Sequence, residues 1–123
     1  MILTSDRSQT GAALALIAEE RGRQFQKWGN QSRTDFMWLA ILMEEVGEFS
    51  EAAIEDHLQK EIRDEVPSGC SYFTERLIEE MTHVAAVSTA IIEGLLKHTE
   101  EDHDLASRQI IRSSTEIPGS KPV

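Results

Sequence analysis

Residues 34–53, TDFMWLAILMEEVGEFSEAA, carry the pattern that decides the fold. Apolar residues recur in this stretch at intervals of three and four, the period of an α-helix with one face turned toward a core. These residues are Leu39, Leu42, Val46, Phe49 and Ala53. Thr34 or Asp35 can cap the first turn, because a short side chain with an oxygen atom accepts a hydrogen bond from a free N–H group there. The stretch therefore predicts a long helix over residues 34–58.

The same period predicts helices on both sides of this stretch. One helix is expected over residues 8–28 and stops near Gly29, and another is expected over residues 72–98. Thr99 and the acidic residues that follow it have the pattern of a new N-cap. A short fourth helix is therefore expected after residue 98.

Helix-breaking and strand-like signals are sparse. The first of the three prolines is Pro67, and no run of useful length alternates apolar and polar residues. We therefore predict an all-α bundle of three long helices and a short C-terminal helix. It should form one domain over residues 1–112, completed by homo-oligomerisation, and a disordered tail over residues 113–123.

The charge balance excludes some classes of partner. The chain of 123 residues has 12 Lys and Arg against 22 Asp and Glu, a formal net charge of −10. This excess disfavours binding to nucleic-acid polymers and to anionic membranes, both of which attract basic surfaces. No apolar run approaches the length of a membrane span. The single cysteine, Cys70, cannot form an internal disulfide, which favours a reducing compartment and a cytoplasmic location.

Two of the predicted helices direct a carboxylate toward the core. On a helical wheel at about 100° per residue, Glu45 lies inside the apolar stripe and Glu48 lies at its edge. Glu80 and His83 repeat this arrangement on the next helix, each offset by 35 residues. Burying an ionised carboxylate is unfavourable by several kcal/mol unless it is paired, protonated or bound to a metal.

Two interpretations of these carboxylates are open at the level of sequence. Basic residues of other helices can pair with them, the candidates being Arg21, Lys27 and Arg76. Alternatively, the carboxylates share a divalent cation. Residues at i and i+3 lie on one helix face, so two adjacent helices would present three carboxylates and an imidazole to one ion. Such a ligand set suits Mg²⁺, and the imidazole moves the preference somewhat toward Mn²⁺.

Two motifs resemble those of a known family. Residues 44–48, EEVGE, followed by Glu80-x-x-His83, resemble the E-E-x-x-E…E-x-x-D signature of MazG-like all-α NTP pyrophosphohydrolases, which are related to dimeric dUTPases. Residues 23–31, RQFQKWGNQ, are similar to the R-Q-x-x-K-W-G-x-Q segment of small phage and bacterial members. The resemblance covers roughly residues 19–96. His83 departs from the signature, because it stands where the family has Asp.

The resemblance implies a function and a set of site residues. It implies a homodimer or dimer of dimers that hydrolyses nucleoside triphosphates (NTP or dNTP) to monophosphates and pyrophosphate with Mg²⁺ or Mn²⁺. The implied metal ligands are Glu45, Glu48, Glu80 and His83. The implied catalytic residues are the same three carboxylates with Glu44 as an outer-shell base. The implied substrate-binding residues are Arg23, Lys27, Trp28 and Gln31.

The sequence leaves three further alternatives open. Trp28 either stacks on a nucleobase or packs into the core. Glu80-x-x-His83 also matches the Glu-x-x-His element of ferritin-like di-iron bundles. Because His83 removes one negative charge from the signature, the domain can also be a non-catalytic bundle that binds nucleotides or partners.

Overall fold

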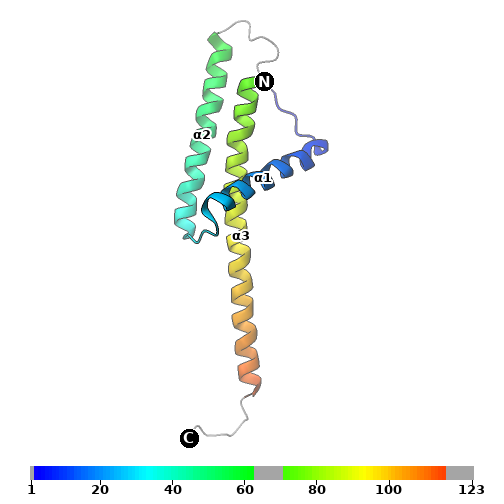
Figure 1. Cartoon of the computed structure of the whole chain (residues 1–123), viewed down its shortest axis with the longest axis vertical. Coiled ribbons are helices and arrows are strands. Elements are labelled where there is room, and N and C mark those ends of the chain that lie inside the picture. Colours follow the sequence, from blue (N-terminus) through cyan, green and yellow to red (C-terminus); the bar gives the residue numbers. More distant parts are fainter. Residues whose placement is uncertain (1, 63–70, 116–123) are drawn as a thin grey trace. The chain divides into compact units, whose positions relative to one another are not determined.

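The structure, a computed structural model, describes residues 2–62 and 71–115 and is helical throughout its regular elements (Figure 1). A short 3-10 turn, η1 (Arg7–Gln9), precedes α1 (Thr10–Trp28). Then follow α2 (Asp35–Ile62) and α3 (Ser71–Thr115). No strand occurs in these two described ranges. The prediction of an all-α fold is confirmed.

The connection between α1 and α2 has the caps that the sequence predicts. Gly29 has a φ of 64°, and its N–H donates to the carbonyl of Phe25 at 2.7 Å, which ends α1. A positive φ of this kind favours glycine, because it has no Cβ. At the start of α2, the Thr34 hydroxyl accepts a hydrogen bond from the N–H of Met37 at 3.2 Å. Thr34 is therefore an N-cap, as predicted.

Helix α2 and the first part of α3 run antiparallel, side by side (Figure 1). Contacts between the two helices show this direction, because Glu55 pairs with Arg76 while Glu45, ten residues earlier, lies by His83. The most buried apolar side chains of the described residues come from these two helices and are small: Ala52, Ala86, Val87 and Ala90. Small side chains allow the two backbones to approach closely, so the residues on either side of them are held within reach of one another.

The prediction of a short fourth helix is wrong. Helix α3 continues without a break through Thr99 and ends only at Thr115. The Thr99 hydroxyl donates to the carbonyl of Leu95 at 2.9 Å instead of capping a new helix. The hydroxyl is thereby satisfied inside the helix, and no Gly or Pro follows closely to stop it.

The chain divides into two compact units, residues 1–91 and 92–123. The sequence predicted one domain over residues 1–112, with a disordered tail from 113, whereas α3 stays helical up to Thr115. Within the second unit, every described side chain up to Ser113 is exposed. The apolar residues of this part of α3 therefore lie on the surface of the described chain. The remainder of the predicted tail, 116–123, lies outside the described residues, as does Cys70.

Replacing Gly94 with alanine should stabilise α3. A Cβ at this position meets nothing within 4 Å, and glycine inside a helix is less favourable than alanine by about 1 kcal/mol. We expect the free energy of unfolding to rise by about that amount in urea titrations followed by circular dichroism. Gly29→Ala is the matched control and should destabilise, because its φ of 64° strains an L-residue. A Gly94→Ala variant that unfolds more easily would show that the position is crowded.

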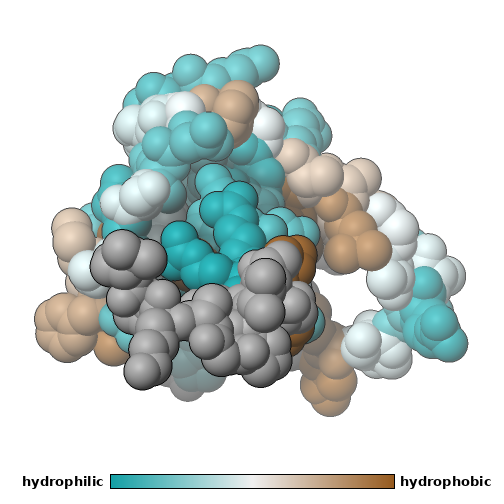
Figure 2. Space-filling view, turned by 90° about the horizontal axis from the view of Figure 1, so that it is seen from below, coloured by the Kyte–Doolittle hydropathy of each residue, from teal (hydrophilic) through white to brown (hydrophobic). Residues whose placement is uncertain are grey.

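An apolar stripe of α2 remains on the surface. At about 100° per residue, its members lie on the side of the helix opposite Glu45. We call it the outer stripe, and it comprises Phe36, Leu39, Met43, Ile54 and Leu58, which are 75%, 50%, 57%, 59% and 47% exposed. Leu39 was expected on the core-facing side, so its exposure differs from the prediction. On the face of the molecule drawn in Figure 2, brown, hydrophobic side chains lie among teal, hydrophilic ones. Helix α2 is thus apolar on two faces, which is typical of a helix buried on both sides.

Across the described ranges, no helix has both the length and the apolar character needed to cross a membrane.

Candidate functional site

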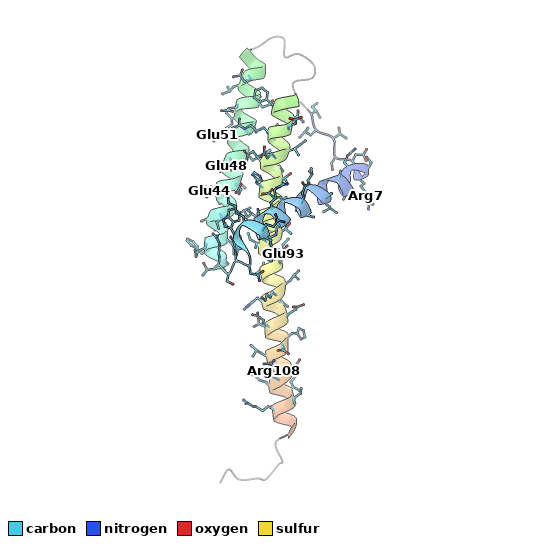
Figure 3. All side chains as sticks on the ribbon, viewed as in Figure 1. Arg7, Glu44, Glu48, Glu51, Glu93 and Arg108 are labelled. Atoms are coloured by element: carbon cyan, nitrogen blue, oxygen red, sulfur yellow. The ribbon has the colours of Figure 1, made fainter. Side chains whose placement is uncertain are left out.

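The packing of α2 against α3 brings four predicted residues together. One ligand atom from each of Glu45, Glu48, Glu80 and His83 can be chosen so that all four lie within 4.8 Å of one another. Each helix contributes an i, i+3 pair, which shares one helix face. Opposite ligands of a six-coordinate divalent cation are about 4 to 5 Å apart, so the cluster has the dimensions for one ion. Of the two glutamates that α2 contributes to the cluster, Glu48 is the exposed one, and Figure 3 shows its position on the helix.

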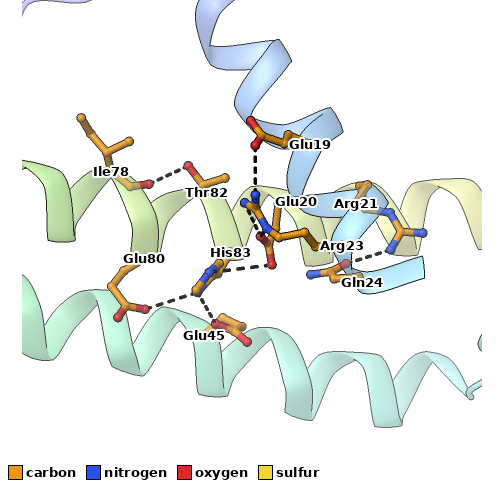
Figure 4. A network of polar contacts seen from close by, with 10 residues as sticks. All are labelled: Glu19, Glu20, Arg21, Arg23, Gln24, Glu45, Ile78, Glu80, Thr82 and His83. Carbon is orange, nitrogen blue, oxygen red and sulfur yellow. Dashed lines mark hydrogen bonds and ion pairs between the residues drawn. The ribbon is translucent and has the colours of Figure 1, made fainter. Parts of the chain in front are cut away.

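His83 lies at the centre of three carboxylates that come from three different helices (Figure 4). Its Nδ1 atom is 3.8 Å from Glu45 Oε2 and 3.7 Å from Glu80 Oε2. Its Nε2 atom is 3.8 Å from Oε1 of Glu20 on α1. These distances are within ion-pair range but too long for hydrogen bonds, so the imidazole does not satisfy the carboxylate oxygens.

Two oxygen atoms in the cluster have no hydrogen-bond partner. Oε2 of Glu45 and Oε2 of Glu80 are both buried and unpartnered. A buried acceptor without a partner is unfavourable, so the two carboxylates favour a cation or a hydrogen-bond donor between them. Among the described residues, the basic side chain within ion-pair distance of both carboxylates is His83. The structure thus places the imidazole of His83 between these two carboxylates.

The surroundings of Glu45 disfavour its charged form. Burial raises the pKa of Glu45 above its ordinary value of 4.5, and the carboxylate of Glu48 raises it further. His83 lowers the pKa of Glu45, but by less than burial raises it. A nearby positive charge would stabilise the charged form of Glu45 that burial disfavours.

The raised pKa predicts how stability depends on pH when divalent cations are absent. The folded chain holds the Glu45 proton more tightly than the unfolded chain does. Its stability should therefore fall as the pH rises from below 4.5 through the raised pKa, and change little beyond it. Glu45→Gln should remove this decline and raise the free energy of unfolding at neutral pH by less than about 1 kcal/mol, since Glu45 is partly exposed. Urea titrations in EDTA at several pH values measure both quantities. An unchanged decline in the variant would assign it to another group.

Glu20 belongs to this network although the sequence did not single it out. Arg23 donates to Glu20 at 2.7 Å and to Glu19 at 3.1 Å, so two carboxylates of α1 hold its guanidinium. Glu20 also faces His83, and it therefore links α1 to the cluster. The Glu20/Arg23 spacing of three residues predicts a pair on one helix face. It contains no information about α3, so only the packing of α1 reveals the second contact.

A pocket of about 960 Å³ adjoins the cluster, within the first unit of the chain. This volume lies at the upper end of the range for small-molecule sites. Glu45 and His83 belong both to the cluster and to the pocket wall, and Glu44 also lines it. The wall includes all four substrate-binding residues that the sequence predicts: Arg23, Lys27, Trp28 and Gln31. Residues far apart in the sequence thus surround one volume.

The pocket wall carries two tryptophans, each with a cation over its ring. The ammonium of Lys27 lies 4.7 Å from the centre of the Trp28 ring. The guanidinium of Arg33 lies 5.4 Å from the centre of the Trp38 ring. Both distances are within the range of cation–π attraction. Trp28 is 55% exposed, so the interpretation that it packs into the core does not describe this structure.

Arg33 and Trp38 also line the pocket, and the sequence reasoning missed both as site residues. Trp38 lies close to Glu45 in angle on the apolar face of α2, where an aromatic residue is ordinarily part of a core. Arg33 lies in the connection before α2 and belongs to neither motif. The position of Trp38 two turns before Glu45, on the same face, was the available signal.

Searches with family models, of curated proteins and of solved structures found no match to this chain.

Proposed function

We propose that this chain is a metal-dependent nucleoside triphosphate pyrophosphohydrolase. The observation that supports this most directly is the cluster of Glu45, Glu48, Glu80 and His83, with two unpartnered carboxylate oxygens, at the wall of a large pocket. The same pocket wall presents cationic and aromatic side chains. A nucleotide has complementary parts, namely a polyanionic chain and a flat base. The resemblance of the two motifs to MazG-like enzymes points to the same reaction.

The donor set fits Mg²⁺ or Mn²⁺. Glu45, Glu48 and Glu80 would supply oxygen ligands, and His83 would supply a nitrogen ligand. When bound, the ion supplies positive charge between the carboxylates and the triphosphate and increases the electrophilicity of the α-phosphorus. Without it, the carboxylates of the pocket would repel the substrate.

The residues of the chain would then position the substrate and accept a proton. Water attacks the α-phosphorus, the bond from that phosphorus to the bridging oxygen breaks, and pyrophosphate leaves with the bond's electron pair. Glu44 is exposed, lines the pocket and directly precedes Glu45, so we assign to it the proton that the attacking water loses. Lys27 lies in the same wall, where its charge can hold the departing phosphates.

Release of pyrophosphate tests this proposal. The full chain is assayed with a panel of NTPs and dNTPs, canonical and modified, in Mg²⁺ and separately in Mn²⁺, with an EDTA control. We expect release of one pyrophosphate per monophosphate formed and no release in EDTA. Tightly bound nucleotide that is never cleaved in either metal would refute the enzyme assignment and favour a binding module.

His83→Asp should shift the metal requirement. Exchanging the imidazole for a carboxylate adds an oxygen ligand and negative charge to the cluster, which favours the hard ion Mg²⁺. We expect the Mg²⁺ concentration for half-maximal pyrophosphate release to fall several-fold, and the preference for Mn²⁺ to decrease. His83→Asn is the control, because it has similar volume but adds no charge. Equal metal dependence in all three proteins would remove His83 from the ligand set.

We propose further that the active form is a homodimer, or a dimer of dimers, assembled through the outer stripe. This stripe leaves five large apolar side chains of one helix about half or more exposed. The most buried apolar residues within the described chain are three alanines and one valine, which form a small core. A second copy can cover the stripe by the same apolar face, as two-fold symmetric interfaces do.

A further inference from the structure

The two tryptophans of the pocket differ in how they are held. Trp28 is the last residue of α1 and is followed by Gly29, whereas Trp38 lies inside the first turns of α2. Trp28 is 55% exposed, while Trp38 is half-buried. A ring that is partly buried on a regular helix is better fixed in direction than a ring at a helix end, which makes it the better platform for a flat ligand.

The position of Trp38 along α2 relates it to the metal-ligand cluster. Trp38, Ile41 and Glu45 all line the pocket and lie within about 60° of one another around the helix. Trp38 precedes Glu45 by seven residues, which corresponds to about 10 Å along the helix axis. One face of α2 thus presents an aromatic ring and, about 10 Å further along the helix axis, a carboxylate.

Arg33 holds the Trp38 ring from one side. Its guanidinium lies 5.4 Å from the ring centre, while its own side chain is exposed in the connection before α2. Cation–π attraction of this kind restricts the indole, and because Trp38 lines the pocket, a part of its ring faces the pocket volume. Base–aromatic stacking tolerates every base, because each has a π-face.

We propose that Trp38 is the residue on which the nucleobase stacks, and that Arg33 is a positioning residue that orients the indole. The inference rests on the proposed function and extends it by assigning the base to the α2 side of the pocket. It differs from the prediction made from the sequence motif, which named Trp28. The α-phosphate of a nucleotide stacked on Trp38 lies toward Glu45, where the reaction is proposed to occur.

Fluorescence of variants with one tryptophan distinguishes the two rings. The chain has two tryptophans, so Trp28→Phe leaves only Trp38, and Trp38→Phe leaves only Trp28. Each variant is titrated in Mg²⁺ with a nucleoside triphosphate that has an uncleavable α,β-methylene bridge, and with inorganic tripolyphosphate, which has no base. We expect the nucleotide to quench Trp38 saturably and tripolyphosphate to leave it unchanged. Quenching of Trp28 alone would overturn the inference.

Binding measurements on Trp38→Ala and Arg33 variants complete the test. Trp38→Ala should weaken nucleotide binding by about 5- to 100-fold and leave tripolyphosphate binding within about twofold. Arg33→Ala should shift the emission maximum of Trp38 in the ligand-free Trp28→Phe background and weaken nucleotide binding, and Arg33→Lys should restore part of both. If Arg33→Ala weakens tripolyphosphate binding equally, Arg33 contacts phosphate and the positioning role is wrong.

The same experiments separate this inference from the proposed function. Pyrophosphate release by the unmodified chain, together with a Trp38 that does not respond to nucleotide, would overturn the inference and leave the function standing. Base-dependent quenching of Trp38 without any pyrophosphate release would support the inference and refute the enzyme. If neither tryptophan responds and nothing is released, both fail.

Discussion

Glu45→Ala should reduce pyrophosphate release by more than about 100-fold. Loss of groups that only support a metal ligand already lowers metal affinity or activity 10- to 100-fold, and Glu45 is proposed as a ligand itself. Its Oε2 atom is one of the two unpartnered buried oxygens, so its removal leaves the cluster with a single oxygen of this kind. Initial rates at saturating Mg²⁺ and nucleotide measure the loss.

A second variant on the same helix controls for general damage to α2. Glu51 is exposed on α2, one turn beyond Glu48, and lies outside the cluster (Figure 3). Glu51→Ala should therefore retain the activity of the unmodified chain within about twofold. Isothermal titration with Mn²⁺ alone should show weaker binding for Glu45→Ala and unchanged binding for Glu51→Ala. Equal activity of the two variants would contradict the proposed metal centre.

Met43→Glu should convert the dimer to a monomer. Met43 is the central residue of the outer stripe and is 57% exposed in the single chain. A glutamate there remains solvated in the monomer, but in an apolar interface it becomes an uncompensated buried charge, which is unfavourable by several kcal/mol. Because the interface is symmetric, each dimer would contain two such charges. Light scattering should give twice or four times 13.8 kDa for the unmodified chain and half of the unmodified mass for the variant.

Conservative variants separate a broken interface from a broken fold. Met43→Leu keeps the apolar volume and should keep the assembly. Gly47→Ala gives an independent signal: a Cβ there meets nothing within 4 Å in the single chain, so a destabilised Gly47→Ala variant indicates a partner close to α2. A Met43→Glu protein with the same mass as the unmodified chain would exclude the outer stripe as the interface.

Local signals predicted much of the fold. The three-and-four spacing gave the three long helices to within a few residues at most ends, and Thr34 and Gly29 marked the connection between α1 and α2. The error at Thr99 has a physical cause, since a threonine hydroxyl can accept from a free N–H at a helix start or donate to a carbonyl one turn back. Short-range sequence does not distinguish these two states.

The acidic cluster and Trp28 were predicted from the sequence, whereas Trp38 was missed as a site residue. Glu45 and Glu80 are polar residues on apolar helix faces, and such a conflict between pattern and chemistry is visible in the sequence. Trp38 agrees with its apolar face and therefore gives no such signal. Glu20 pairs with Arg23 on its own helix, and this local pair is a sufficient reason for a glutamate at that position. Its second contact, with His83, becomes visible only when α1 is packed against α3.

By itself, the sequence determined that the chain is helical, where the first two long helices begin and end, and that carboxylates face inward on two of them. These properties depend on backbone caps and on a period of 3.6 residues, both of which operate within a few turns of one helix. Only the tertiary structure decided which side chains from different helices meet: Glu20 with His83, and Trp38 in the same pocket as Glu45. Such contacts depend on how whole helices pack, which is set by many weak contacts distributed over the chain.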